Sequence, residues 1–318
     1  MLAISLSEYT INFLLIMHPI SSSTNKKMYT WSHLIGLITM MCLGAVIGQL
    51  VIQVLFKPTG IPSLHGEALK VTYRNFLLAA QAIMATSIFI LGPILYWYLI
   101  EKKPIRYFFN GEKRYQRFVL LTLALVLTAM VVNTWFTYWN MHLKFPSFLE
   151  NFEKWAQAKE VDLKHLTELL TTFYAPKDLL VGILVIGMIP AIGEELVFRG
   201  IIQNLFFRSM QNIHIAILLS AFIFSAIHLQ IYGFLPRFLL GVLFGYLYWW
   251  TKNLVFPIVA HFLNNTISLI MLFLYQINAT TYEVENDQIL PTPMLLLFAI
   301  IGTFIAIYIR KNTLYLHK

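Results

Sequence analysis

The chain has 318 residues, of which 58% are hydrophobic, 15% are aromatic and only 12% are charged. Because soluble domains carry about 25% charged residues, this composition and the mean hydropathy of +0.69 exclude an ordinary soluble protein. The formal net charge of +8 lies largely in short loops between apolar segments, so it indicates orientation in a membrane rather than a nucleic-acid partner.

Residues 1–32 are expected to form an N-terminal extension. The stretch 2–20 is moderately apolar, but it contains Glu8 and lacks a basic start, so it makes a poor signal peptide. A polar run at 21–27 ends this stretch, and Met28 is an alternative start of the chain.

Apolar segments long enough to cross a bilayer follow along the chain. A run of ~18 or more apolar residues with few charges is typical of a membrane-spanning helix. Helices and closed barrels satisfy every backbone group in lipid, and these runs are too uniformly apolar for barrel strands. The eight predicted spans are 33–56, 76–100, 118–140, 181–205, 214–232, 236–251, 254–276 and 291–309. The sequence therefore predicts an all-α fold, a polytopic membrane bundle of about eight transmembrane helices.

The longest polar connection covers residues 141–177, between the third and fourth predicted spans. Its apolar side chains recur at spacings near three and four, which is typical of an amphipathic helix lying on the membrane surface. A covering element over the bundle is the other interpretation. The five expected regions are the extension 1–32, the N-terminal transmembrane helices 33–140, the amphipathic connection 141–177, the catalytic helical core 178–276, and the last loop, final span and tail 277–318.

Charged loop residues predict the orientation of the bundle. Acidic Glu283, Glu285 and Asp287 fill the last predicted loop, whereas lysine and arginine are more numerous in the loops on the side that holds both termini. Because basic residues favour the cytoplasmic side, both termini are expected to be cytoplasmic. The expected location is the bacterial inner membrane, as an integral, multi-pass protein.

The fourth, fifth and seventh predicted spans contain polar clusters. Ionisable residues inside a membrane are costly and usually functional. Any one cluster is also consistent with a structural role, such as a buried Glu–Arg pair or a hydrogen bond between helices. Their joint occurrence favours a single functional pocket. The side chains singled out are Glu194, Glu195, Arg199, His228, His261 and Asn265.

Helical spacing gives the first cluster its direction. Glu195 and Arg199 are four residues apart and can pair along one helix, so Arg199 is expected to keep Glu195 ionised and rigid. Glu194 lies about 100° round the helix and can face a cavity. For Glu194 and His228 to lie at one depth, the fourth helix must be centred near Glu194 and extend to about Phe206.

Peptide hydrolysis suits these side chains. It needs an activated water, a proton donor for the leaving amine and hydrogen-bond donors for the oxyanion. A buried glutamate can act as the base, one histidine can orient the water, and a second histidine with an asparagine can donate to the oxyanion. A zinc ion held by Glu194, His228 and His261 is the alternative, although the helical HExxH signature is absent.

Three motifs in this order resemble a known family. They are EExxxR from Glu194, FxxxH from Phe224 and HxxxN from His261, within residues 180–276. This set resembles the membrane-embedded CPBP proteases, which include the type II CAAX prenyl endopeptidases and bacteriocin-processing or self-immunity proteins. The N-terminal half and the last span resemble the family only as generic hydrophobic helices.

The resemblance implies an all-helical fold with a cavity open to cytoplasm and lipid. It implies that Glu194 activates water with help from His228, and that His261 and Asn265 donate to the oxyanion. It also implies a membrane-associated peptide or protein as substrate, and no residue marks prenyl recognition. The family is often called a metalloprotease, so a metal-free mechanism and a divalent metal such as zinc both stay open.

Two other functions are consistent with the same residues. One is a catalytically idle membrane scaffold or immunity factor that descends from proteases. The other is an ion-coupled transporter, in which Glu, Arg and His would relay protons. The paired broken helices of inverted transporter repeats are not evident in the sequence, which favours the protease.

Overall fold

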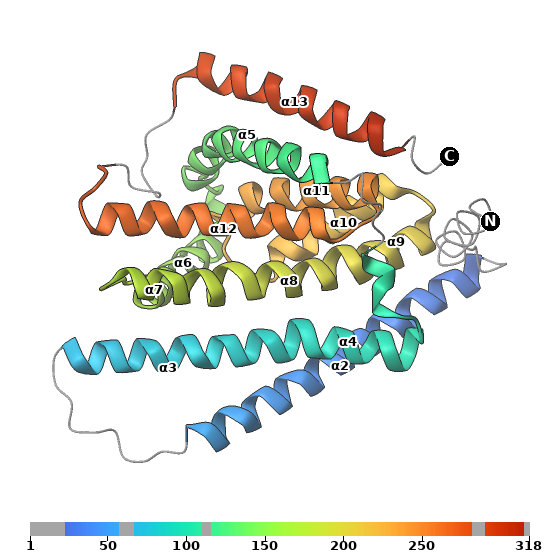
Figure 1. Cartoon of the computed structure of the whole chain (residues 1–318), viewed down its shortest axis with the longest axis horizontal. Coiled ribbons are helices and arrows are strands. Elements are labelled where there is room, and N and C mark those ends of the chain that lie inside the picture. Colours follow the sequence, from blue (N-terminus) through green and yellow to red (C-terminus); the bar gives the residue numbers. More distant parts are fainter. Residues whose placement is uncertain (1–22, 57–66, 110–115, 282–289, 315–318) are drawn as a thin grey trace.

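The computed structural model is a bundle of helices (Figure 1). It contains no β-strand within the described residues, so the predicted all-α fold is confirmed. The described residues are 23–56, 67–109, 116–281 and 290–314.

Six helices are long and apolar enough to cross a membrane. The shortest of them have 22 residues, which at 1.5 Å per residue cover the hydrocarbon core of roughly 30 Å. The protein is therefore an integral, multi-pass membrane protein. The six helices are Met28–Leu55, Val71–Glu101, Phe118–Met141, Pro176–Met210, Val255–Gln276 and Thr292–Thr313.

The first helix is longer than predicted. Helix α2 (Ser23–Leu55) begins at Ser23, so residue 32, where the N-terminal extension was expected to end, lies inside this helix. No proline or glycine separates its polar start from the apolar run, which explains why the helix extends so far. The rest of the predicted extension, residues 1–22, lies outside the described residues.

Helix α2 packs backbone to backbone against the next long helix. That helix runs through α3 (Glu67–Thr86), η1 (Ser87–Leu91), α4 (Gly92–Tyr96) and η2 (Trp97–Glu101). A Cβ added at Gly92 would lie 2.8 Å from the Met40 carbonyl oxygen, so only glycine permits this close approach.

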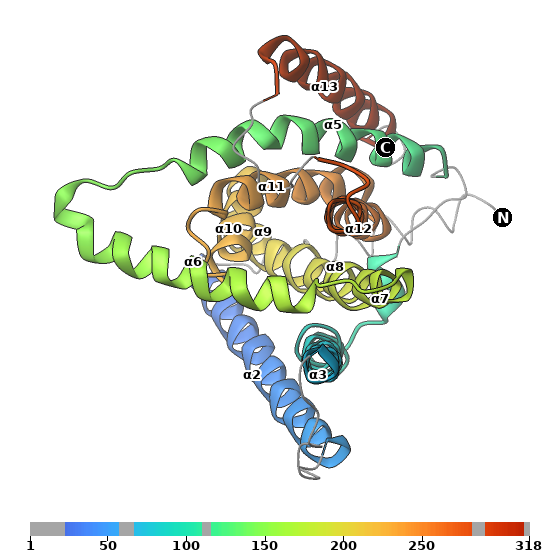
Figure 2. The same cartoon turned by 90° about the vertical axis from the view of Figure 1, so that its left-hand side faces the viewer.

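The predicted connection 141–177 contains a helix that lies across one end of the bundle. This helix, α6 (Glu150–Leu170), runs crosswise to α3 and α12, both of which are seen end-on in Figure 2. It follows α5 (Gln116–Met141), which packs against α13 (Thr292–Leu314) and α12 (Val255–Gln276). The apolar side chains of Phe152 and Trp155 on α6 remain exposed.

The polar cluster at Glu194 lies on the longest helical segment. Pro176–Met210 has 35 residues, about 52 Å in length, and Glu194 lies close to its middle. This position confirms the predicted centre. Its successive parts are α7 (Pro176–Gly182), η6 (Ile183–Met188), α8 (Ile189–Glu195), η7 (Leu196–Ile202) and α9 (Gln203–Met210). The π-helical turn η6 precedes Pro190, whose missing N–H cannot continue the regular hydrogen-bond ladder.

Two predicted spans are shorter helices. Helix α10 (Ile213–Ala226) has 14 residues and covers about 21 Å, and α11 (Phe234–Thr251) has 18 residues. The prediction that the fifth span extends to residue 232 is therefore wrong. The chain leaves the helix because Leu229 adopts a left-handed conformation with φ of 55°. His228 consequently lies in the turn that follows α10.

Candidate active site

Glu195 and Arg199 form a buried ion pair inside the longest helix, as their spacing predicts. Arg199 Nη1 donates a hydrogen bond of 2.7 Å to Glu195 Oε1, and the side chains are 1% and 0% exposed. Arg199 lies in the π-helical turn η7, a rare conformation that often occurs at functional sites. A buried ion pair of this kind holds the Glu195 carboxylate in one orientation.

Arg199 also connects this helix to α10 and α11. Its Nη2 donates a hydrogen bond of 2.9 Å to the carbonyl oxygen of Gly241 on α11. The rings of Phe224 and Phe244 lie 4.7 and 5.5 Å from the guanidinium carbon. Helix α11 approaches closely because Gly241 lacks a side chain: an added Cβ would lie 3.1 Å from that of Ala221.

His261 of α12 connects the two glutamates. Its Nδ1 donates a hydrogen bond of 2.8 Å to Glu195 Oε1, while its Nε2 lies 3.8 Å from Glu194 Oε2. Because the carboxylate can only accept, Nδ1 carries a proton and Nε2 is the nitrogen that faces Glu194. The imidazole stacks on Phe244 with centroids 5.5 Å apart, and Phe224 meets it edge-on at 5.9 Å.

His228 joins the site from the turn after α10. Its Nδ1 donates a hydrogen bond of 2.8 Å to the Phe224 carbonyl oxygen, one of the carbonyls left unpaired at a helix end. The Phe224 ring contacts both histidines edge-on, His228 at 5.2 Å and His261 at 5.9 Å. Since Nδ1 is occupied, Nε2 of His228 is the nitrogen available for chemistry.

Asn265 lies one turn beyond His261 on α12. Its Nδ2 donates a long hydrogen bond of 3.4 Å to the Ile186 carbonyl oxygen in η6, and its Oδ1 accepts one of 3.3 Å from Asn264. The structure thus brings Glu194, Glu195 and His261 together directly. His228 is connected to this group by the Phe224 ring, which contacts both histidines. Asn265 lies at the edge of the cluster.

The sequence analysis did not single out three further residues at the site. Gly241 and Phe244 of α11 surround Arg199, and the spacing of Gly241 and Gly245 is the small-residue pattern of close helix packing. Arg237 lies in the first turn of the same helix and interacts electrostatically with Glu194. An arginine within a predicted span was the available signal.

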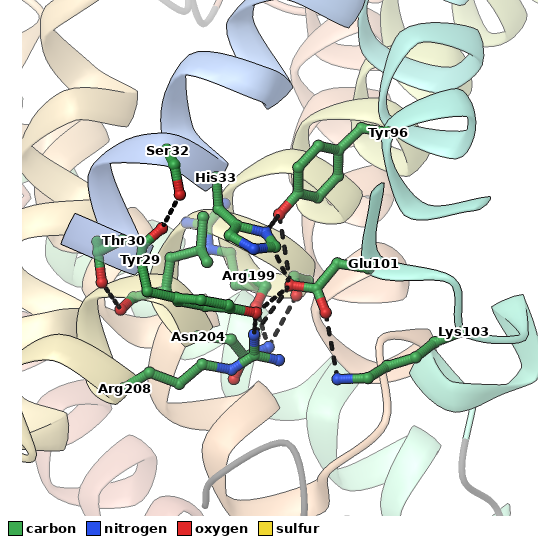
Figure 3. A network of polar contacts seen from close by, with 12 residues as sticks. Tyr29, Thr30, Ser32, His33, Tyr96, Glu101, Lys103, Arg199, Asn204 and Arg208 are labelled. Carbon is green, nitrogen blue, oxygen red and sulfur yellow. Dashed lines mark hydrogen bonds and ion pairs between the residues drawn. The ribbon is translucent and has the colours of Figure 1, made fainter. Parts of the chain in front are cut away.

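A second buried network lies near the end of the helical segment Pro176–Met210, which also carries Glu194 (Figure 3). Glu101 Oε1 accepts a hydrogen bond of 2.9 Å from Arg208 Nη1 and lies 3.3 Å from the Tyr29 hydroxyl. Glu101 Oε2 lies 3.1 Å from Lys103 Nζ. Burial lowers the pKa of Lys103, and the Glu101 carboxylate opposes this shift. The network fixes α9 to α2 and η2, and so anchors one end of the helix that carries Glu194.

One protein family matches residues 176–267, described as type II CAAX prenyl endopeptidase Rce1-like. The matched residues begin with α7 and end in α12 just beyond Asn265, so they include all six side chains singled out in the sequence. This region is similar to the Rce1-like family. The match is consistent with a protease of the CPBP family and confirms the resemblance seen in the three motifs.

The chain is also similar to an uncharacterized protein, YpbD, of Bacillus subtilis (strain 168), with 32% identity over 88 residues. The match spans 26% of this chain and 40% of the length of that relative. No solved structure matches the chain.

The arrangement of the Rce1-like site bears on the predicted zinc ligands. Glu194 and His261 approach one another, whereas the Phe224 ring meets both His228 and His261 edge-on, with centroids 5.2 and 5.9 Å away. No three His, Cys, Asp or Glu side chains in the described ranges are grouped closely enough to hold a metal ion. The donor set in this arrangement does not fit the three protein ligands of a catalytic zinc centre.

Proposed function

We propose that this protein is an intramembrane endopeptidase that hydrolyses peptide bonds of membrane-associated proteins or peptides. The Rce1-like match supports a hydrolase of this class. The observation that carries the proposal is the pairing of Glu194 Oε2 with His261 Nε2, 3.8 Å apart near the middle of a 35-residue apolar helix. Placing a carboxylate and an imidazole at this depth in a membrane costs free energy, and such groups are usually paired and functional.

Glu194 is the base in this proposal. At 3.8 Å, a single water can hydrogen-bond to both Glu194 Oε2 and His261 Nε2. Glu194 takes a proton from that water while the water oxygen attacks the scissile carbonyl carbon. Glu194 later gives the proton to the leaving amine. His228 Nε2 assists by orienting the same water.

Stabilisation of the oxyanion falls to His261 and Asn265. His261 Nε2 donates to the oxyanion when the ring is doubly protonated, because Nδ1 is already committed to Glu195. Asn265 Nδ2 has a second hydrogen besides the one it directs to Ile186. Glu195, held by Arg199, keeps the imidazole in place and acts as a positioning residue.

The decisive experiment compares wild-type protein with Glu194→Gln. Glutamine keeps the size of the side chain but cannot take a proton, so proteolysis is expected to disappear while thermal stability in detergent stays unchanged. Comparing the membrane and secreted proteomes of cells that express each protein would reveal the substrates. Glu150→Gln, which removes an exposed carboxylate on α6, is the matched control and retains activity.

The same comparison separates the two alternative functions. A scaffold or immunity factor would keep its cellular effect in Glu194→Gln, and a proton-coupled transporter would lose uptake without any change in peptide products. Either result contradicts the protease.

A further inference from the structure

A cavity of about 760 Å³ lies beside the site, at the end of the bundle crossed by α6. Its walls come from α5, α6, the segment that joins them and the turn between α10 and α11, which contributes Gln230, Tyr232 and Gly233. Charged side chains of both signs also line it, namely Lys144, Lys164, Glu153 and Glu160. Figure 2 faces this end of the molecule and shows α6 crossing in front of the α10–α11 connection. The cavity is large enough to hold several residues of an extended peptide.

The short helix α10 explains the cavity. With 14 residues it ends after about 21 Å, so the irregular turn that holds His228 and Gln230 lies at the depth of the neighbouring spans. Irregular backbone at that depth is tolerated only where it is buried in protein or lines a polar cavity. His228 and the cavity wall therefore share one turn, which joins the cavity to the proposed active site.

Arg237 is a largely buried cation behind this wall. Its Nη2 donates a hydrogen bond of 2.6 Å to Gln230 Oε1, whereas its Nη1 is buried and has no hydrogen-bond partner among the described residues. No carboxylate of the described part of the chain lies within 4.0 Å of it. Buried charges in proteins are normally paired, so this guanidinium has capacity for an anion.

Arg237 lies directly behind the cavity wall, next to the wall residues Gln230 and Gly233. Gly233 is part of the wall, and a Cβ added there would lie 3.3 Å from Arg237 Nη2 and 3.7 Å from Nη1, so any larger residue would cover the guanidinium. The Tyr232 hydroxyl in the same wall is buried and makes no hydrogen bond to a described residue. Two buried donors without acceptors among the described residues thus lie at or behind one side of the cavity, where a shift of the Gln230 side chain would give a ligand access to them.

Arg237 interacts with charged groups of both the cavity wall and the proposed active site. It interacts electrostatically with Glu194 and with Glu160 of α6, and also with His228. Gln230 connects the two sides, since its Nε2 donates to Glu160 Oε1 at 3.5 Å while its Oε1 accepts from Arg237. An anion that binds here lies next to the reacting groups.

We propose that this cavity binds a substrate peptide through a carboxylate, which Arg237 and the Tyr232 hydroxyl receive. The inference rests on the proposed function, because the peptide so anchored extends towards Glu194. A guanidinium pairs with a carboxylate through two parallel N–H donors. If the carboxylate of the ligand displaces the Gln230 side chain from Arg237, both Nη atoms gain an acceptor. The carboxylate comes either from the C-terminus of the substrate or from an Asp or Glu side chain.

Binding by the Glu194→Gln protein tests this proposal without requiring turnover. The probes are four pools of fluorescein-labelled apolar octapeptides, in which one internal position is Glu or Gln and the C-terminus is an acid or an amide. Fluorescence polarisation in detergent gives each dissociation constant. A pool with the recognised carboxylate is expected to bind about tenfold more tightly than its amide counterpart, the usual worth of a charged hydrogen bond. The pool that shows the effect identifies the source of the carboxylate.

The variants are built in the same Glu194→Gln background. Arg237→Gln is expected to abolish the tenfold preference, and Tyr232→Phe to reduce it while leaving the melting temperature unchanged. Lys144→Gln, which removes a cation that itself lines the cavity, is expected to leave the preference intact. Equal preferences with and without Arg237, or no saturable binding of any pool, would overturn the proposal. Proteolysis that persists in Glu194→Gln would instead contradict the proposed function. The binding measurement would still test whether Arg237 recognises a carboxylate.

Discussion

Glu195 Oε1 accepts hydrogen bonds from both Arg199 and His261, so one buried oxygen determines how two helices meet at the site. The carboxylate is completely buried and Arg199 is its cationic partner. The geometry of the imidazole therefore depends on a charge pair that takes no part in the proposed bond cleavage.

Arg199→Ala is expected to destabilise the fold as well as the site. Removing one member of a buried ion pair typically costs about 3–5 kcal/mol, because the remaining charge stays buried. We expect a large fall in melting temperature in detergent and little folded protein. Arg199→Lys keeps the charge but loses the second donor to Gly241, so it should be intermediate; an alanine variant as stable as wild type would contradict this role.

His261→Ala and Asn265→Ala are expected to slow proteolysis without removing it. Loss of one oxyanion donor typically lowers kcat by about 10²–10³-fold. Turnover of a substrate found in the proteome comparison measures the effect, with Ser268→Ala on the same helix as the control.

Chelation separates the metal-free mechanism from the zinc mechanism. We expect chelators to leave wild-type activity unchanged, because Glu194, His228 and His261 do not converge as three ligands. Stoichiometric zinc in active protein, lost together with activity in His261→Ala, would establish the zinc mechanism instead.

At the level of helices, the Glu101 network anchors the helix that carries the site. Glu101 lies on η2 and is 3% exposed, and it pairs with Arg208 of α9 and Lys103. Glu101→Gln leaves two cations without their carboxylate and is expected to lower stability by about 3–5 kcal/mol. Equilibrium unfolding in detergent measures this loss. Activity per folded molecule should change little, since Glu101 lies outside the proposed site; loss of activity in fully folded protein would contradict an anchoring role.

The helices also show which features are readable from sequence. Six of the eight predicted spans are long apolar helices, because unbroken apolar runs have few alternatives in lipid. The end of α10 was not predictable, since residues 227–232 contain no proline or glycine and the break depends on the left-handed Leu229.

The site was predictable in part. The Glu195–Arg199 pair follows from spacing within one helix, whereas the hydrogen bond from His261 to Glu195 joins residues 66 positions apart. Which of the two glutamates takes the His261 hydrogen bond depends on how α12 packs against the long helix. The cavity under α6 likewise depends on how three distant segments meet.

For the molecule as a whole, the orientation in the membrane is the main expectation still to be tested. Figure 1 shows the start of α2 and the end of α13 at the same end of the bundle, as required if both termini share one side. We expect a fluorescent protein fused to the C-terminus to fold in the bacterial cytoplasm and fluoresce. A phosphatase inserted after Asn278, in the turn at the opposite end, should be active in the periplasm. The reverse pattern would contradict the orientation.

The short helix α10 has a consequence for the lipid around the protein. Ile215, Leu218 and Phe222 are exposed along one face of this helix, which is only about 21 Å long. A bilayer next to an apolar surface shorter than its hydrocarbon core thins locally, at a cost of fractions of a kcal/mol for each ångström of mismatch. Where the bilayer is thinner, its aqueous surface lies closer to His228. A peptide that approaches along α10 therefore has less hydrocarbon to cross.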